Sequence, residues 1–327
     1  MPQPTPAQMH VDRYLTNLSV AFVQQSRNFV ADKVFPVVPV AKQSDLYPVY
    51  DRGYFFRDEM RPRPLGGEAA KAGYKVTNQR YHCEEFALAH TIDDRVRANA
   101  DQPLNPDRAG MRLLTTQAMI HRDRDWSSKY FKTGVWTTDL TGVASNPTGN
   151  QFLQFDQSGS DPIGVVDAEK DRIAETTGYE PNVLVIGRKV YRTLRNHPDI
   201  IDRVKYTQRG VIDTEILASL FGVERVVVPG SVQNTAVEGA ADNFSFIVAS
   251  DDMLLVYAAP EPALEQPSGG YIFAWTGLIP GETNAFGGVI QRMRDEKAHS
   301  DHLEIRVAYD MHVVAPDLGV FFDSCVA

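Results

Sequence analysis

A stretch near the start of the chain, residues 45–94, constrains the fold more than any other, because it consists of two extended arms joined by an irregular tip. Strand-favouring residues lie on both sides of the tip, among them Tyr47 and Val49 before it and Tyr74 and Val76 after it. The prolines and glycines between them forbid regular structure there. The return arm has no continuous apolar face, and a lone two-stranded ribbon is at best marginally stable in water. We therefore predict a long hairpin that lies on a neighbouring copy of the same protein.

The tip of this hairpin carries charges of both signs. The charged residues that we single out are Arg57, Asp58, Glu59, Arg61, Arg63 and Lys71. They form either a solvated loop or a surface that docks electrostatically on a neighbour. Because the hairpin lacks support within its own chain, we favour docking and expect these residues to make intersubunit contacts.

The segment before the hairpin is an arm that also needs a covering surface. Residues 14–22 show apolar side chains at helical spacing, and residues 34–40 are apolar but broken by Pro36 and Pro39. Proline does not fit a central strand, so this part should be extended or an edge strand. It is covered either by a neighbouring subunit or by the chain's own core, on which terminal segments commonly dock. The arm residues that we assign to intersubunit contacts are Val34, Phe35, Val37 and Val38.

A long helix is predicted after the hairpin. Asn105 is placed as its N-cap, Pro106 as its first residue, and Gly134 where a helix would stop. A helix of about 26 residues would run ~39 Å, which is longer than most helices of globular proteins. Its apolar residues occupy more than one face, which indicates a helix that other parts of the molecule hold from several sides.

A second lobe of α/β or α+β type should begin near Asp161, after a long polar loop at residues 137–160. The elements expected in it are helices over 161–178, 188–197 and 213–221, short strands over 182–187 and 224–231, and a hairpin pair within 244–259. The chain then ends in a strand over 303–313 with the alternation typical of a half-buried strand. We expect it to pair with the strand near Phe86 and so to return the chain to the first lobe.

Composition restricts the class of protein. A chain of 327 residues exceeds the size at which one core usually keeps growing, so two lobes are expected. With 43% hydrophobic and 23% charged residues and no apolar run near the ~18 needed to cross a bilayer, the chain is typical of a globular protein. Its first residues carry no secretion signal, so we expect synthesis in the cytosol.

Charge and cysteine content narrow the class further. The net charge of -9 argues against a protein whose main task is to bind phosphates, although incidental contact with packed DNA is compatible with it. Cys83 and Cys325 match no metal or redox spacing and are expected as free thiols in a reducing compartment.

Two short motifs have residue types that can carry chemistry. Residues 121–126, HRDRDW, resemble the kinase catalytic loop but lie inside the predicted helix without the other kinase motifs, so we expect salt bridges along or between helices. The spacing of His299, Asp301 and His302 does not fix a metal geometry, and we expect solvated loop residues there. Short motifs for acyl, phosphoryl, metallo and hydride chemistry are absent from the sequence. We assign no catalytic, cofactor-binding or metal-binding residue.

The order of these parts resembles the major capsid protein of tailed bacteriophages, the Hong Kong 97 type of shell fold. The amino-acid sequences of residues 47–64, 84–101 and 123–139 are also similar to those of capsid proteins of siphovirus and prophage origin. The resemblance implies an α+β fold with an arm over 1–44, an extended loop over 45–84, a peripheral domain over 85–160 and 291–327 with a spine helix over 105–133, and an axial domain over 161–290. The covalent cross-link of the type member is not carried over, because its asparagine and glutamate have no match here.

The resemblance implies a structural subunit without catalytic activity. Such a subunit assembles into hexamers and pentamers, and then into an icosahedral capsid around double-stranded DNA. The implied partners are copies of itself, a scaffolding protein, a portal and a decoration protein, with non-specific contact to packaged DNA and no membrane. Assembly would take place in the host cytoplasm, and the product would be the virion. Two alternatives remain: an encapsulin-like compartment, and a cytosolic α/β enzyme that uses the hairpin as an oligomerisation arm.

Overall fold

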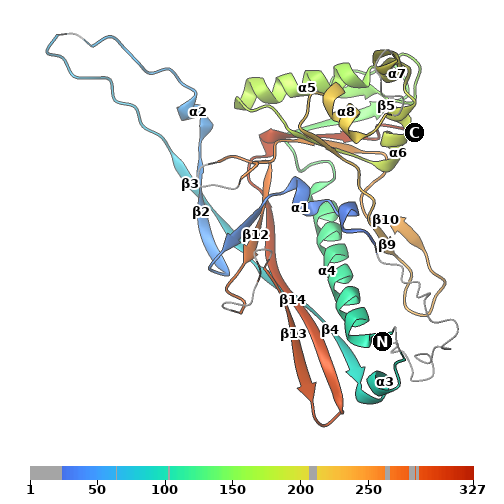
Figure 1. Cartoon of the computed structure of the whole chain (residues 1–327). Helices are drawn as coiled ribbons and strands as arrows, with labels where there is room; N and C mark the ends of the chain where they lie inside the picture. The colour runs from blue at the N-terminus through green and yellow to red at the C-terminus, as the bar shows by residue number, and fades with distance from the viewer. Residues whose placement is uncertain are drawn as a thin grey trace.

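The computed structural model describes residues 24–63, 65–101, 104–205, 212–261, 266–279, 284 and 287–327. The helical pattern predicted at residues 14–22 lies outside the described residues. Figure 1 shows two sheets joined by a long central helix, with a hairpin that projects far from the body. The predicted α+β fold class is confirmed.

A five-stranded sheet forms the elongated part of the body. It contains β1 (Val37–Val40), β12 (Gly270–Trp275), β14 (Ser300–Val313), β13 (Gly288–Asp295) and β4 (Glu84–Asp93). The long strand β14 is its centre: β4 pairs with one edge, and β12 and β13 pair with the other edge, end to end. Val307 lies opposite Phe86, so the predicted pairing of the last long strand with the strand near Phe86 is confirmed.

The long helix α4 (Pro106–Tyr130) lies along this sheet (Figure 1). Its N-cap is Asn105, whose side chain accepts a hydrogen bond from the N–H of Arg108 at 3.0 Å. The helix approaches the sheet closely at Gly110, where an added Cβ would lie 2.7 Å from the His90 ring. The predicted helix over 105–133 is therefore confirmed, with its last turn ending at Tyr130.

A six-stranded mixed sheet forms the other lobe. Its order is β6 (Gln151–Leu153), β5 (Thr138–Val143), β15 (Gly319–Asp323), β11 (Met253–Val256), β7 (Val183–Ile186) and β8 (Arg225–Val227). One face is covered by α5 (Pro162–Thr177), α6 (Arg188–Arg195), α7 (Pro198–Val204) and α8 (Thr214–Leu220). The other face packs against α1 (Ala31–Val34) and the end of α4. The sheet is thus buried on both faces, which explains why its central strands are apolar throughout.

The division of the chain between the two sheets differs from the predicted ranges. Strands β5, β6 and β15 belong to the six-stranded sheet, although residues 85–160 and 291–327 were assigned to the other lobe. Conversely, β12 and β13 belong to the five-stranded sheet, although they begin within 161–290. Parallel pairing of Val320 with Thr138 joins segments that are far apart in sequence, and short-range patterns carry no trace of it.

Two local predictions in the second lobe are corrected. Residues 244–259 do not form a hairpin: β10 (Phe244–Phe246) pairs with β9 (Val232–Asn234), and β11 lies between β15 and β7. The turn before β11 instead receives the start of α6, because the carbonyl of Ser250 accepts from the N–H of Lys189 at 2.8 Å. Pro198 does not only end a helix; it is also the first residue of α7.

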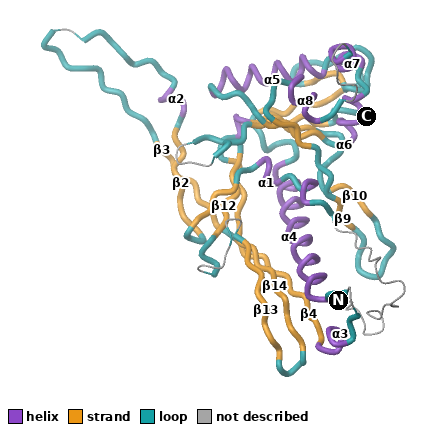
Figure 2. The backbone as a smooth tube through the Cα atoms, in the orientation of Figure 1, coloured by secondary structure: helices purple, strands orange, loops and turns teal. Residues whose placement is uncertain are grey.

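The remaining elements are short. The projecting hairpin is formed by β2 (Ser44–Tyr50) and β3 (Val76–His82), with α2 (Arg52–Phe55) after β2. Helix α3 (Asp94–Ala98) follows β4, and single turns of 3-10 helix lie at Ser26–Asn28 and Pro316–Leu318. Figure 2 shows that the part of the hairpin beyond β2 and β3 is loop apart from α2.

Candidate assembly surfaces

The root of the hairpin is fixed to the body. Tyr81 of β3 stacks on Phe273 of β12 with ring centroids 4.7 Å apart, and Tyr47 of β2 lies 5.3 Å from the same ring. The N–H of His82 donates to the carboxylate of Asp310 at 2.7 Å. The prediction that the whole stretch lacks support in its own chain is therefore wrong for the root, because these aromatic contacts come from a strand nearly two hundred residues away.

The distal part of the hairpin projects into solvent (Figures 1 and 2). An ion pair between Arg52 and Asp317, 2.9 Å long, connects α2 to the body. Beyond it, large apolar side chains are exposed: Phe55 by 59%, Phe56 by 61% and Met60 by 91%. Exposed apolar surface of this kind marks an interaction site, so the distal hairpin is the first candidate assembly surface.

The six charged residues predicted at the tip all lie on this projecting loop, and their contacts are local. Arg57 lies 4.0 Å from Glu59, Lys71 lies 3.4 Å from Glu68, and Arg63 donates to the carbonyl of Gly67 at 2.6 Å. Asp58 accepts from the N–H of Met60 at 3.0 Å. Exposed ion pairs of this kind contribute little to stability, so these charges are free to find other partners at small cost.

The arm residues divide into two groups. Val34 and Phe35 are completely buried in the chain's own core, where the Phe35 ring meets Trp126 and Trp136 edge-on at 6.1 and 6.4 Å. Their assignment to intersubunit contacts is therefore corrected: the alternative, folding back on the chain's own core, holds for them. Val37 and Val38 lie in β1, a half-buried edge strand.

A buried carboxylate that the sequence analysis missed holds the arm in place. Asp123 of α4 is 1% exposed and accepts hydrogen bonds from the N–H groups of Val30 and Ala31, both at 3.0 Å, and from the hydroxyl of Ser231 at 2.9 Å. Burial raises the pKa of Asp123, and these three donors oppose the rise. The signal in the sequence was an acidic residue three positions before the buried Trp126, on the same face of the helix. Its neighbours form salt bridges as predicted, Arg122 with Asp32 at 2.9 Å and Asp125 with Lys129 at 2.7 Å.

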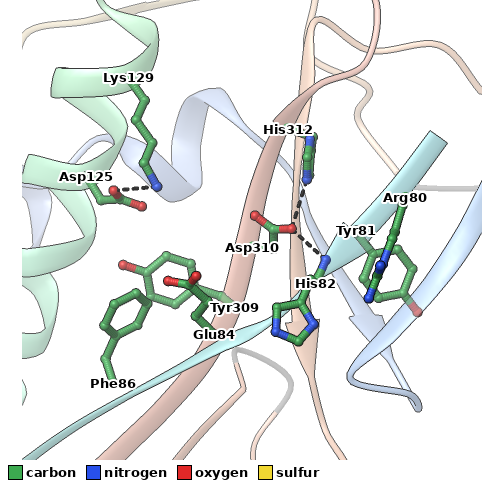
Figure 3. Close-up of a pocket in the computed structure, with 10 residues that line it drawn as sticks. All are labelled: Arg80, Tyr81, His82, Glu84, Phe86, Asp125, Lys129, Tyr309, Asp310 and His312. Carbon is green, nitrogen blue, oxygen red and sulfur yellow. Dashed lines mark hydrogen bonds and ion pairs between the residues drawn. The ribbon is translucent and has the colours of Figure 1, made fainter.

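A groove of about 490 Å³ lies beside the hairpin root, between α4 and β14 (Figure 3). It is lined by Arg80, Tyr81, His82, Glu84, Phe86, Asp125, Lys129, Tyr309, Asp310 and His312. Burial opposes ionisation of Asp310, but hydrogen bonds from His312, at 2.8 Å, and from the His82 N–H hold its pKa below the usual value. Of the described lining residues, only Tyr81 and Tyr309 carry a hydroxyl group, and none carries a thiol.

A network of six charged residues fixes the far end of the five-stranded sheet. Its members are Asp94, Arg97, Asp107, Arg292, Arg294 and Asp301. Asp301 is 4% exposed and binds Arg97 at 2.7 Å and Arg292. The prediction of a solvated loop residue is therefore wrong for Asp301. Strand β14 begins one residue before it and directs its side chain toward arginines of α3 and β13. His302 bonds to the Thr91 hydroxyl at 2.7 Å.

Three further sequence expectations bear on the candidate surfaces. Cys83 and Cys325 are free thiols, as predicted, and both are buried. Within the described residues no group of three or more potential ligands is placed to hold a metal ion. Of the helices in the described part of the chain, none combines the length and apolar character needed to cross a membrane.

Comparisons with known proteins point to one class. No family model matches the chain. The major capsid protein of Burkholderia phage BcepMu is 24% identical over 301 residues, which cover 87% of this chain and 90% of that protein. The major capsid protein of Pseudomonas phage JBD67 is also 24% identical, over 97% of both chains.

Solved structures show the same fold. A phage-related protein from Bordetella bronchiseptica RB50 superposes with a TM-score of 0.68 at 21% identity, over 92% of this chain and 94% of that one. The capsid structure of cyanophage P-SCSP1u gives 0.60 at 10% identity, over 96% and 92%, and the holo-SrpI encapsulin complex from Synechococcus elongatus PCC 7942 gives 0.52 at 11%, over 99% and 96%. The chain therefore has the Hong Kong 97 type of shell fold, as the resemblance predicted.

Together, the fold and the two sequence relatives support a structural role for the chain, that of a capsid subunit. Both named relatives are capsid proteins, which supports this role over the rival expectation of a cytosolic enzyme.

We expect Asp123→Ala to loosen the arm. Each buried donor left without an acceptor costs about 1–3 kcal/mol, and three donors share this carboxylate, so the free energy of unfolding should fall by about 3 kcal/mol or more. Urea unfolding measures this loss, and limited proteolysis should cut faster within residues 24–43. Asp125→Ala on the same helix removes only a partly exposed ion pair and should cost less than ~1 kcal/mol. Equal effects of the two substitutions would contradict the arm-holding role.

The Asp301 network predicts a pH dependence with a defined sign. Hydrogen bonds from Arg292 and Arg97 lower the pKa of Asp301 from 3.8 to about 2, although burial acts to raise it. Its contribution to stability is therefore complete above pH ~4 and disappears as the pH falls toward 2. The melting temperature, measured from pH 6 to pH 2, should be lower for Asp301→Asn than for the unsubstituted protein at high pH. The two melting temperatures should converge in acid. Glu296→Gln, at an exposed position, serves as the control. A difference that is independent of pH would overturn this account.

Proposed function

We propose that the chain assembles into hexamers and pentamers, and these into an icosahedral head that encloses double-stranded DNA. The observation that carries the proposal is the projecting hairpin, whose distal half exposes large apolar side chains that its own chain does not cover. Heterologous contacts between identical subunits close into rings, and projections that overlie adjacent subunits connect rings into a shell.

In this proposal the hairpin docks on a neighbouring subunit. The tip residues Arg57, Asp58, Glu59, Arg61, Arg63 and Lys71 make intersubunit contacts, as the sequence predicted. The edge strand β1 contributes Val37 and Val38, since within the described residues it pairs with β12 alone and lies at the edge of its sheet. Val34 and Phe35 act as the arm's anchor in its own subunit.

The parts of the chain take the roles that the family resemblance implies. We propose that the hairpin is the extended loop, the five-stranded sheet with α4 the peripheral domain, and the six-stranded sheet with α5 to α8 the axial domain around the centre of a capsomer. We propose no catalytic role for any residue. The net charge of -9 fits a shell wall that touches packaged DNA without binding it tightly.

The proposed partners are chiefly further copies of the chain. A scaffolding protein, a portal and a decoration protein are additional partners that the family resemblance implies. Assembly would take place in the host cytoplasm, and the mature product would be the virion. An encapsulin-like compartment is the second candidate, favoured by the similarity to the holo-SrpI encapsulin complex. DNA inside purified particles would separate a phage head from such a compartment.

Replacement of residues 58–72 by a short turn tests the hairpin's role. Because the root contacts at Tyr81 and Phe273 remain, the body should keep its urea unfolding midpoint. Particles should nevertheless disappear, as measured by sedimentation and negative-stain microscopy, because the docking surface is gone. Normal particles from this variant would refute docking by the hairpin. A folded wild-type chain that forms no rings or shells at any concentration would sink the proposed function itself.

A further inference from the structure

One helix of the six-stranded lobe presents only positive charge to solvent. Helix α6 buries Val190 and Leu194 in the core of that lobe and exposes Arg188, Arg192 and Arg195. The three arginines are four and three positions apart, so they follow one face of the helix. We call them the arginine face. It lies near the C-terminus, on the side of the lobe away from the projecting hairpin (Figure 1), and is therefore separate from the first candidate assembly surface.

The arginine face has no acidic partner within the described residues. Helix α6 contains neither aspartate nor glutamate, and the ion pairs of the described chain around it join other residues. The neighbouring cation, Lys189, is engaged elsewhere, because its amine donates to the carbonyl of Ala327 at 3.2 Å. The long helix α4 differs, since there Asp125 pairs with Lys129 at 2.7 Å. The positive charge of the arginine face is thus left for an anion from outside the chain.

Two of the three guanidinium groups are held over aromatic rings. The guanidinium of Arg188 lies 5.4 Å from the centroid of the Phe246 ring, and that of Arg195 lies 5.7 Å from the centroid of the Tyr191 ring. A guanidinium that lies over a ring keeps the N–H donors of its edge available, and these donors match the geometry of a phosphate. Side chains held in this way also lose less conformational freedom when they bind. The arginine face is therefore preorganised for an anionic ligand.

The residue types of α6 favour phosphates over a protein partner. Its apolar residues are buried or, in the case of Tyr191, half-buried, so the exposed side offers none of the apolar anchors on which protein interfaces depend. Nucleic acids are bound instead through arginine and lysine contacts to phosphates. Residues 188–205 carry six basic and two acidic residues, although the net charge of the chain is -9. This region is thus a local exception to the acidic character of the chain.

The length of the arginine face suits weak contact with a duplex. At 1.5 Å per residue, Arg188 and Arg195 are separated by about 10.5 Å along the helix axis. Duplex DNA carries one phosphate charge per ~1.7 Å of its axis, so this length meets about six phosphates, of which three arginines neutralise about half. Binding by one subunit should be weak, whereas several subunits that bind the same duplex strengthen one another.

We propose that the arginine face binds the phosphate backbone of double-stranded DNA and lies on the inner side of the assembled shell. This inference rests on the proposed function, a head that encloses double-stranded DNA, and names the surface of the subunit that meets the DNA. Contacts to phosphates carry no sequence information, so the binding is independent of DNA sequence. The position of α6 also gives the shell wall an orientation, because the helices on its side of the six-stranded sheet then face the DNA.

DNA binding by the unassembled chain tests the inference. The full-length chain, kept below the concentration at which it assembles, is mixed with a short fluorescent duplex of random sequence, and fluorescence anisotropy gives the affinity. Three phosphate contacts should contribute about -2.7 to the slope of log affinity against log salt concentration, at roughly -0.9 each. Their part of the affinity should fall about 40-fold between ~50 and ~200 mM salt. Arg188→Gln/Arg192→Gln/Arg195→Gln should bind more weakly and lack this part of the slope.

Matched variants identify the cause of the loss. Arg108→Gln/Arg112→Gln/Arg124→Gln removes three exposed arginines from α4, a helix that also carries aspartates, and should leave the slope unchanged. Lysines in place of the three arginines of α6 keep the charge and should retain most of the slope. Equal losses from the α4 and α6 glutamine variants, or no loss from the α6 variant, would overturn the inference. An α6 variant that binds DNA normally but no longer assembles would instead assign this face to an acidic surface of a second copy.

Thiol labelling tests the inner placement in assembled particles. The native thiols stay silent because both are buried, and burial raises the pKa of Cys83 to about 12. In intact empty particles, Arg192→Cys should react with a small maleimide but not with a maleimide on a polymer too large to enter. Opening the particles should make it react with both. Reaction of intact particles with the large reagent would place the face outside and overturn the inference.

The two levels of the proposal fail separately. The duplex measurement needs no particles, so it decides whether the arginine face binds DNA even if assembly does not occur. An unsubstituted chain that forms no particles would overturn the proposed function. Normal particles from a chain whose α6 arginines contribute nothing to duplex binding would overturn only the inference.

Discussion

The stacking of the hairpin root on β12 is the interaction on which the proposed role of the projecting hairpin depends. A two-stranded ribbon in water has no stable orientation of its own, so a projection formed from one can serve assembly only if its base is rigid. Tyr81 and Tyr47 provide this base by packing against the same ring of Phe273, and Asp310 adds a hydrogen bond to the backbone of His82. The distal half is thereby aimed in one direction, which reduces the entropy lost when it docks.

A second hydrophobic cluster, which shares strand β12 with the cluster at the hairpin root, holds the arm. Phe35 sits among Tyr130, Trp126 and Trp136, and Gly270 of β12 gives it room, since an added Cβ there would lie 2.4 Å from its ring. Arm, helix and β12 therefore meet at one point. Tyr130 extends this connection because its hydroxyl bonds the carbonyl of Met311 in β14. The two sheets are consequently coupled through α4, so a force on the hairpin reaches the other lobe through packed side chains rather than through a flexible linker.

The sequence predicted those elements whose causes are local. The caps Asn105 and Asp161 located two helices, and an apolar run located the short strand β7. The errors have a common origin in contacts between distant residues. Phe35 looked like a surface that needed a partner because its covering rings lie about a hundred residues further on. Asp301 looked solvated because the arginines that pair with it come from α3 and β13. It is buried because it lies in strand β14.

Assembly surfaces of this kind also have to stay soluble before they meet. The distal hairpin exposes several aromatic side chains in a segment of the chain where Arg57, Arg61 and Arg63 are interspersed, and the cation of Arg57 lies 5.8 Å from the Tyr54 ring. Charges placed among apolar residues discourage non-specific association, and like charges on identical patches oppose contact between two hairpins. The charges of the distal hairpin therefore limit non-specific contact between subunits, which favours ordered association over aggregation.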